Sequence, residues 1–243
     1  MRLLIGIDDT DVLGAPIGTG CLARMLEKKL PDKVKLWGVI RHQLLVDPRI
    51  PYTSHNSPAC IALDLDDRDI IPQIVRRAID HIEELASPGS DPGLCITFAD
   101  TGLSDVVSFG LACTQDLMTQ AQARDIAAQA GIYLAGLGGT EDGVIGALAA
   151  VGLTAYGWSG RFLEFNGLRN LPDPVRVDQL IAHGLLPVAL DQDASVPPNN
   201  ASIATNGWIS PRLWGGRPIV PVRLDEGCWK ALGKKPADME IAE

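Results

Sequence analysis

Apolar residues recur along the first 152 positions with two periods, and this pattern predicts alternating strands and helices. Residues 2–8 form a short, nearly continuous apolar run, which is typical of a strand buried on both faces. Residues 70–86 carry apolar side chains every three or four positions, which predicts the clearest amphipathic helix of the chain. Weaker patterns predict strands at 34–40, 59–65, 94–98 and 132–136, and helices at 20–30, 115–130 and 143–152.

This alternation favours an α/β or α+β fold class for the first part of the chain. After Arg169 the pattern changes, because prolines become frequent and the apolar runs become short. We therefore expect an α/β region over residues 1–170 and a Pro-rich C-terminal extension over residues 171–243. Within the extension, residues 191–207 are typical of a linker or exposed loop, and residues 208–223 contain short strand-like runs.

The composition indicates a folded globular protein. Of 243 residues, 46% are hydrophobic and 21% are charged, a balance too apolar for a disordered chain. The formal net charge of −9 argues against an extended surface for DNA or RNA, because neutralising phosphates requires clustered Lys and Arg. A local basic patch is compatible with this charge.

The cysteines and the N-terminal segment narrow the class of protein further. The five cysteines are widely spaced and form no CxxC pair, which argues against a zinc ribbon and against a disulfide framework. The sequence enters an apolar strand at once, without the pattern of a cleavable signal, and no apolar run approaches the roughly 20 residues of a membrane helix. We therefore expect a cytoplasmic protein that has neither DNA nor a membrane as a partner.

Three carboxylates stand within four positions at the end of the first predicted strand, in the motif Gly6-Ile-Asp-Asp-Thr-Asp11. Clustered carboxylates repel one another, so a folded site that keeps them ionised usually contains a cation. Oxygen ligands favour Mg²⁺ or Mn²⁺, which makes Asp8, Asp9 and Asp11 candidate metal ligands. The alternative is an acidic turn that caps the following helix.

A glycine-rich turn precedes the helix predicted at 20–30. Gly18, Thr19 and Gly20 would present backbone N–H groups at a helix N-terminus, an arrangement that binds anions such as phosphate. The Thr19 hydroxyl would bond or accept a phosphate, and the alternative is that Thr19 caps the helix. The turn is not a Walker A loop, since no Gly-Lys-Ser/Thr follows.

Two further polar segments are candidate parts of a site. His55 and Asn56 lie in a polar loop, where a histidine can act as an acid, a base or a phosphate donor, or can simply be solvated. A second glycine-rich loop opens the last predicted helix, and its backbone would offer N–H groups to an anion. The candidate binding residues of this loop are Gly138, Gly139, Thr140 and Gly143. Its acidic residues Glu141 and Asp142 suit a helix N-terminus as well as a metal.

Four segments, taken in order, resemble the archaeal tRNA(Ile) agmatidine synthetase family. The strongest is the motif at residues 6–11, followed by the glycine turn of the next helix. Residues 50–59 resemble that family's Ile-Pro-Tyr-Lys-Thr-Arg-Gly-Asn-Gly-Ala, and residues 90–93 resemble its Asp-Pro-Gly turn. Residues 143–152 resemble its Gly-Leu-Ile-Gly-Ala-Leu-Ala-Ala-Ile-Gly. The likeness spans roughly residues 1–170 and covers only the family's N-terminal kinase-like and ferredoxin-like portions.

The resemblance implies an ATP-dependent enzyme with a compact kinase-like α/β domain, a ferredoxin-like portion nearby and a small β-containing extension. The family uses ATP and Mg²⁺ to phosphorylate the C2 carbonyl oxygen of a cytidine, and agmatine then displaces the phosphate. Its aspartates match Asp8, Asp9 and Asp11, and its autophosphorylated threonine matches Thr19. Thr10, inside the same motif, would then contact the nucleotide.

The chain also differs from that family. The family's OB-type RNA-binding domain and zinc ribbon have no counterpart in this sequence, and the basic residues of one family loop become Thr53 and His55, which removes positive charge. These differences favour an ATP- and Mg²⁺-dependent phosphotransferase or ligase that acts on a small molecule. Two alternatives stay open: a tRNA cytidine-modifying enzyme that binds RNA only through a separate partner, and a non-enzymatic nucleotide-binding regulatory protein.

Overall fold

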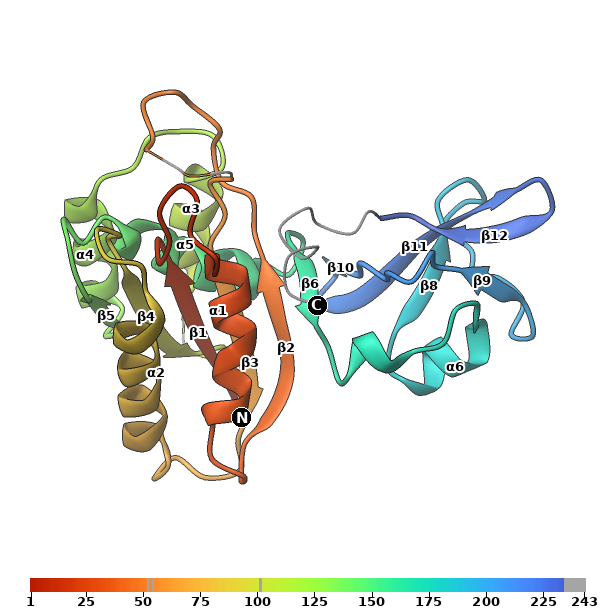
Figure 1. Cartoon of the computed structure of the whole chain (residues 1–243), viewed down its shortest axis with the longest axis horizontal. Coiled ribbons are helices and arrows are strands. Elements are labelled where there is room, and N and C mark those ends of the chain that lie inside the picture. The colour runs from red at the N-terminus through yellow and green to blue at the C-terminus, as the bar shows by residue number, and fades with distance from the viewer. Residues whose placement is uncertain (52, 54, 101, 234–243) are drawn as a thin grey trace.

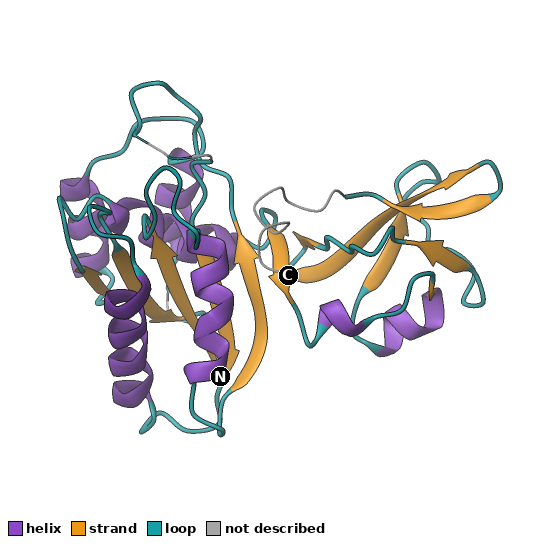
Figure 2. Ribbon diagram, viewed as in Figure 1, coloured by secondary structure: helices purple, strands orange, loops and turns teal. Residues whose placement is uncertain are grey.

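The computed structural model describes residues 1–51, 53, 55–100 and 102–233. Over these residues the protein is a mixed α/β fold, in which 12 strands join one sheet and helices pack on it (Figure 1, Figure 2). The predicted fold class is therefore confirmed. Of the helices in the described ranges, none combines the length and the apolar character needed to cross a membrane.

The sheet runs through the whole described chain in the order β5-β4-β1-β3-β2-β6-β10-β11-β12-β9-β7, and β8 pairs with β11. The strands are β1 (Arg2–Asp8), β2 (Lys35–Arg41), β3 (Ala59–Asp64), β4 (Gly93–Phe98), β5 (Tyr133–Gly136), β6 (Arg161–Glu164), β7 (Val175–Arg176), β8 (Leu186–Ala189), β9 (Ser202–Ala204), β10 (Arg212–Trp214), β11 (Arg217–Asp225) and β12 (Cys228–Ala231). The helices are α1 (Thr19–Leu26), α2 (Ile71–Leu85), α3 (Ser104–Ala112), α4 (Gln120–Gln129), α5 (Gly143–Tyr156) and α6 (Val177–Ala182), with short 3₁₀ turns at η1 (Glu27–Lys29) and η2 (Leu168–Asn170).

The central strand β1 is buried on both faces, as its apolar run predicts. Its side chains alternate, so Leu3 and Ile5 pack beneath α1 and α2, whereas Leu4 packs on the opposite face, in the cluster that contains α5. The backbone of α5 comes very close to β1 at Gly6, where a Cβ atom would lie 2.0 Å from the carbonyl oxygen of Ala147. This close approach fixes the N-terminal end of α5 beside the end of β1.

The topology gathers three loops at one edge of the sheet. Strand β1 is antiparallel to both β3 and β4, and β2 and β5 are antiparallel to these in turn. Strands β1, β2 and β5 therefore run in the same direction, and their C-terminal ends share one edge. The predicted site segments that follow β1, β2 and β5 leave the sheet at this edge.

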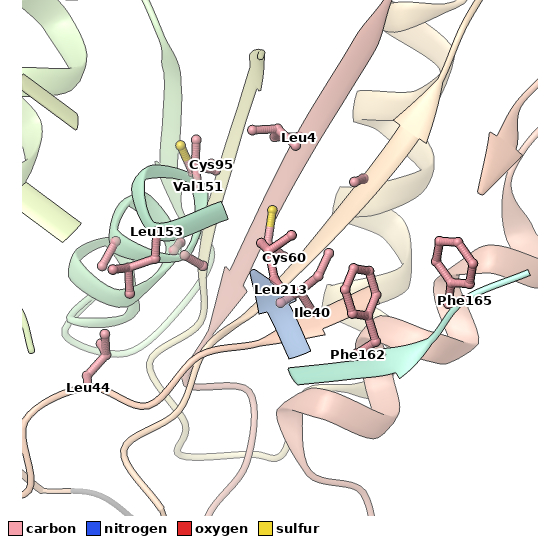
Figure 3. Close-up of a cluster of buried hydrophobic side chains, with 14 of the residues drawn as sticks. Leu4, Ile40, Leu44, Cys60, Cys95, Val151, Leu153, Phe162, Phe165 and Leu213 are labelled. Atoms are coloured by element: carbon pink, nitrogen blue, oxygen red, sulfur yellow. The ribbon is translucent and has the colours of Figure 1, made fainter. Parts of the chain in front are cut away.

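Strand β6 connects the N-terminal strands to the C-terminal ones. It pairs with β2 on one side and with β10 on the other, so the sheet continues without a break into β10 and β11. Figure 3 shows the same continuity in the core, where Ile40, Phe162 and Leu213 of three neighbouring strands lie close together. The predicted boundary at residue 170 stays a prediction, and η2 occupies this position in the structure.

Several elements differ from the sequence predictions. The helix predicted at 115–130 begins at Gln120, because the Thr119 hydroxyl accepts a hydrogen bond from the Gln122 backbone and the Gln122 side chain accepts one from the Thr119 backbone. Helix α5 continues past Gly152 to Tyr156, so Gly152 does not end the helix as predicted. This glycine instead allows α3 to pack closely, because a Cβ at residue 152 would lie 2.1 Å from the carbonyl oxygen of Val106. Residues 191–207 contain a strand, β9, in addition to turns. Besides β9, the strands and α-helices that the sequence pattern did not predict are α3, α6, β6, β7, β8 and β12.

Candidate functional site

A cavity of about 420 Å³ opens at the edge where β1 and β2 end. Asp8, Asp9 and Asp11 line it together with the N-terminal turn of α1, Gly18 to Gly20. The loop that follows β2 forms a second wall, and the loop between α3 and α4 forms a third. Residues predicted from separate sequence motifs thus share one cavity.

Asp11 and Thr19 hold each other at the start of α1. The Thr19 hydroxyl donates to Asp11 Oδ1 at 2.9 Å, and the Thr19 backbone N–H donates to the same oxygen at 3.2 Å. The hydroxyl of Thr53 donates to Asp11 Oδ2 at 3.1 Å. The N-cap of α1 is Gly18, which has no side chain to form a cap, so the alternative in which Thr19 caps the helix is wrong. Asp11 satisfies the first helical N–H instead, which agrees with the alternative of a helix-capping acidic turn.

Thr10 lies beneath the cavity and does not line it. Its side chain is fully buried, and its hydroxyl donates to the Thr19 hydroxyl oxygen at 3.0 Å. The Thr10 backbone N–H points at the same oxygen, 3.3 Å away. The Thr19 hydroxyl oxygen is therefore fixed by two donors while its proton is directed at Asp11.

Asp8 is the last residue of β1 and is packed against the first turns of α5. A Cβ atom at Gly146 would lie 1.8 Å from Asp8 Oδ2, so the absence of a side chain at 146 makes the space for this carboxyl group. Burial raises the pKa of Asp8 well above its usual value, and the neighbouring charges of Asp9 and Asp11 raise it further. A hydrogen bond from the Asp9 backbone lowers it in part.

Asp9 adopts the left-handed backbone region, with φ of 55°. Burial raises the pKa of its carboxyl group to about 6, with further contributions from Asp91, Asp11 and Asp142. Burial first, and the neighbouring carboxylates second, disfavour the ionised forms of Asp8 and Asp9, and a bound cation would favour those forms. Among the described residues, no three His, Cys, Asp or Glu side chains are arranged so that they could hold a metal ion.

The second glycine-rich loop is tied to Asp91 instead of opening onto the cavity. The backbone N–H of Thr140 donates to the Asp91 carboxylate, and that of Gly143 donates to the Asp91 carbonyl oxygen at 2.9 Å. The four predicted binding residues lie outside the cavity lining: Gly138, Gly139, Thr140 and Gly143. Asp142 does line the cavity and accepts a hydrogen bond from Gln120 at 2.6 Å, whereas Glu141 pairs with Arg124 on α4.

His55 and Asn56 both line the cavity, and their role in binding stays a prediction. The Asn56 amide donates to the carbonyl oxygen of Leu45 at 2.8 Å, so this side chain stabilises the loop that follows β2. Beside it, the Arg41 guanidinium donates to the Ser57 hydroxyl at 2.9 Å, and both of these residues line the cavity.

Sequence reasoning missed two basic residues and one whole wall of the cavity. Arg41 and Arg49 line it, and Arg49 forms an ion pair with Asp47 at 2.7 Å. Arg41 thus brings positive charge to a site that the sequence differences predict to be depleted of it. The wall formed by the loop between α3 and α4 was missed because the sequence pattern places this loop in a helix. The Thr119-x-x-Gln122 pattern could have located the true helix start, since it is the signature of a capping box. The missed residues of this wall are Cys113, Asp116, Leu117, Met118, Thr119 and Gln120.

Comparison with known proteins finds a partial relative. No family model matches the chain. The chain is 28% identical over 188 residues to the tRNA 2-agmatinylcytidine synthetase TiaS of Pyrococcus horikoshii, a match that covers 74% of this chain and 42% of that protein. The chain therefore spans less than half the length of the curated relative that it matches.

Solved structures agree with this similarity. The crystal structure of TiaS in complex with its isoleucine tRNA and ATP matches with a TM-score of 0.54 and 26% identity, over 63% of this chain and 36% of that one. A complex of TiaS with the tRNA, AMPCPP and agmatine matches with a TM-score of 0.53 and 25% identity, over 62% and 36%. The crystal structure of a tRNA fluorescent labeling enzyme matches with a TM-score of 0.53 and 27% identity, over 63% and 36%. In sequence and in fold, the chain is thus similar to part of TiaS.

Proposed function

We propose that this protein is an ATP- and Mg²⁺-dependent enzyme of the ligase or phosphotransferase type. The observation that carries the proposal is the cavity itself, in which the three aspartates of the N-terminal motif meet the glycine turn of α1. The similarity to TiaS supports ATP as the nucleotide, because crystal structures of TiaS contain ATP or AMPCPP. A cavity of about 420 Å³ is within the range of roughly 300–1,000 Å³ typical of small-molecule sites.

The phosphates of ATP would bind at the N-terminal turn of α1. Backbone N–H groups and the positive end of the helix favour an anion there. The guanidinium group of Arg41 lines the same cavity and would add positive charge, whereas that of Arg49 is paired with Asp47. The apolar side chains of Leu44, Leu117 and Met118 would cover the less polar part of the nucleotide.

Mg²⁺ would be held by Asp8 and Asp9 together with phosphate oxygens of the nucleotide, since Mg²⁺ commonly uses one or two carboxylates and substrate phosphates. The residues present fit this ion in their donor type, because Asp8 and Asp9 bring carboxylate oxygens to the same cavity. Bound Mg²⁺ would neutralise charge on the phosphates. Asp11 would position Thr19, whose hydroxyl would bond the transferred phosphoryl group or accept it.

The acceptor of this proposal is a small molecule. TiaS complexes contain an isoleucine tRNA and agmatine, so the second candidate is a tRNA cytidine modification for which a separate partner supplies RNA binding. The net charge of −9 favours the small molecule. The third candidate is a regulatory protein that binds nucleotide without turnover.

The first test is calorimetric titration with ATP in the presence and absence of Mg²⁺, followed by product analysis of the same sample. We expect binding that depends on Mg²⁺ and slow conversion of ATP to ADP or AMP. In Asp8→Asn the Mg²⁺-dependent part should fall at least about tenfold, because a charge-assisted contact is lost. The variant should fold normally, since it replaces a buried carboxyl group by a neutral group of the same shape.

The matched control is Asp66→Asn, which removes one carboxylate from an exposed position outside the cavity. It should bind ATP as the unmodified protein does. Nucleotide binding without turnover would favour the regulatory protein, and dependence on a co-purifying RNA or basic partner would favour the tRNA reaction. Absence of ATP binding with and without Mg²⁺ would refute the assignment of Asp8, Asp9 and Thr19.

A further inference from the structure

Three arginines stand side by side across three neighbouring strands. Arg41 of β2 is the register partner of Arg161 of β6, and Arg161 is in turn the partner of Arg212 of β10. Directly opposed residues of antiparallel strands project on the same face, with Cβ atoms about 4.5–5.5 Å apart. We call Arg41, Arg161 and Arg212 the arginine row.

The arginine row begins in the cavity and leads away from it. Arg41 lines the cavity, whereas Arg161 is exposed and lies beyond its lining. The row is on the face of the sheet that carries α1. A Cβ atom at Gly20 of α1 would lie 2.8 Å from Cδ1 of Leu163, so the Leu163 side chain faces α1. Arg161 lies two positions before Leu163 on the same strand and therefore projects on the same face. The row therefore starts beside the glycine turn to which we assign the phosphates of ATP.

This arrangement is unfavourable for the fold. Like charges directly opposite each other destabilise a sheet. Burial lowers the pKa of Arg212, and the positive charge of Arg161 lowers it further. In the described part of the chain, neither Arg161 nor Arg212 forms an ion pair with a carboxylate, and the guanidinium of Arg212 faces the ring of Trp214 at 5.8 Å.

Several arginines elsewhere in the protein are compensated. Carboxylates outnumber basic side chains by 30 to 21, so partners are plentiful. Within the described residues, arginines that pair with a carboxylate include Arg2, Arg49, Arg76, Arg124, Arg176 and Arg223. Within the described ranges, Arg161 and Arg212 thus face each other without the carboxylate that these other arginines have. This is the pattern expected where an anionic ligand supplies the missing charge.

We propose that the arginine row is a second anion subsite, which binds a phosphate group of the acceptor, and that the acceptor is therefore a phosphorylated small molecule. This inference rests on the proposed function, because it takes the cavity beside the row as the ATP site. Planar guanidinium groups bind phosphate oxygens in pairs, and two or three of them suit the double charge of a phosphomonoester. Arg41 belongs to both sites, because it lines the cavity and is the first residue of the row.

The test uses the full chain loaded with AMPCPP and Mg²⁺, so that the nucleotide cavity is filled, and inorganic pyrophosphate as the calorimetric probe. Pyrophosphate should bind the loaded protein, and the double variant Arg161→Ala/Arg212→Ala should weaken this binding at least about tenfold. AMPCPP affinity should not change. Arg161→Lys/Arg212→Lys should retain part of the pyrophosphate affinity, because it keeps the charges and loses the paired donors.

The matched control is Arg76→Ala/Arg176→Ala, which removes the same charge from two exposed arginines away from the row and should leave pyrophosphate binding unchanged. Thermal unfolding gives an independent readout. Removal of opposed like charges should leave the Tm of Arg161→Ala/Arg212→Ala unchanged or raise it, whereas a purely structural role for these arginines would lower it.

The outcomes separate this inference from the proposed function. Equal pyrophosphate affinity with and without the row, or no pyrophosphate binding by protein that binds AMPCPP, overturns the subsite. If AMPCPP does not bind but pyrophosphate binding still requires Arg161 and Arg212, the subsite stands and the proposed function fails. A short single-stranded RNA is titrated in parallel. If it binds through the row while pyrophosphate does not, the occupant is an RNA backbone and the proposal is overturned.

Discussion

At the scale of single residues, the carboxylates of the N-terminal motif have different tasks. Asp11 accepts hydrogen bonds on both oxygens, from Thr19 and Thr53, and so builds the start of α1. Asp8 and Asp9 are held with raised pKa values, Asp8 beside α5 and Asp9 near other acidic groups. The spacing of the motif predicted that these residues share one site, but spacing could not distinguish a carboxylate that caps a helix from one that is free to bind a cation.

Asp9→Asn should stabilise the protein in a pH-dependent way. The pKa of Asp9 is about 6 in the folded state and is near 3.9 in an unfolded chain, so ionised Asp9 destabilises the fold. This cost is fully present above about pH 6 and disappears as the pH falls towards 3.9. We therefore expect Asp9→Asn to raise the Tm at pH 7.5 and to have a much smaller effect at pH 4.5.

His42 also makes stability depend on pH, because burial lowers the pKa of its imidazole to about 3. This effect destabilises the fold as the pH falls below 6.5, and it is present in both proteins. Comparing the Tm of the two proteins at each pH therefore separates the effect of Asp9 from that of His42. Asparagine also tolerates the left-handed backbone at this position. A Tm difference that does not change with pH would contradict the assigned titration. Addition of Mg²⁺ and ATP should raise the Tm of the unmodified protein by more than that of Asp9→Asn.

At the scale of elements, strong hydrophobic periodicity was sufficient to locate a helix or strand, whereas features that depend on tertiary packing could not be predicted from the sequence. The pattern located β1 and α2 to within one residue, because both bury side chains at a regular period. It missed α3 and merged the following loop with α4. It also took Gly152 as the end of α5, since sequence alone does not say which glycine allows a neighbouring backbone to approach. The third wall of the cavity was missed because the loop that forms it was predicted as part of α4.

Gly146→Ala tests how α5 positions Asp8. A methyl group at 146 would occupy the position of the Asp8 carboxylate, so we expect a loss of stability of about 1–3 kcal/mol and, in addition, a loss of Mg²⁺-dependent ATP binding. The matched control is Gly152→Ala on the same helix, where the methyl group would meet the backbone of α3 at Val106.

Gly152→Ala should lower stability by a similar amount, and the fraction that remains folded should bind ATP normally. Urea unfolding and calorimetry at a temperature where both variants are folded measure the two effects. Equal ATP affinity in Gly146→Ala and Gly152→Ala would mean that Gly146 serves packing and does not position Asp8.

At the scale of the whole molecule, the sheet and one of its two buried clusters extend across the predicted boundary at residue 170. Arg169 reinforces this connection from η2. Its guanidinium donates to the carbonyl oxygen of Leu163 in β6 at 3.0 Å and to that of Ile209 at 2.9 Å, and it lies 3.4 Å from the centre of the Trp208 ring. The composition changes after residue 169, and from this change the sequence predicts a boundary near residue 170. Composition carries no information about backbone pairing between β6 and β10, which joins the two sides of that boundary.

We expect a single unfolding transition for the described region, because the two parts share hydrogen-bonded strands. Arg169→Ala leaves two carbonyl groups without their donor and removes the contact with Trp208, so it should lower stability by about 2–4 kcal/mol. Arg176→Ala, at an exposed ion pair, should change stability by less than about 1 kcal/mol. Differential scanning calorimetry checks both, and two separated transitions in the unmodified protein would show that the parts unfold independently.

The order of the strands also has a consequence for synthesis of the chain. Asp8 leaves the ribosome long before the part of α5 that holds it in place, at Gly146, because β2, β3, β4 and β5 are made between the two. Contacts between such distant positions form late and slowly, since a long loop must close first. A nascent chain that stops before α5 therefore exposes its acidic motif without the complete cavity. If the cavity binds nucleotide as we propose, nucleotide would stabilise only those molecules that include α5, and so would favour them over chains that stop before it.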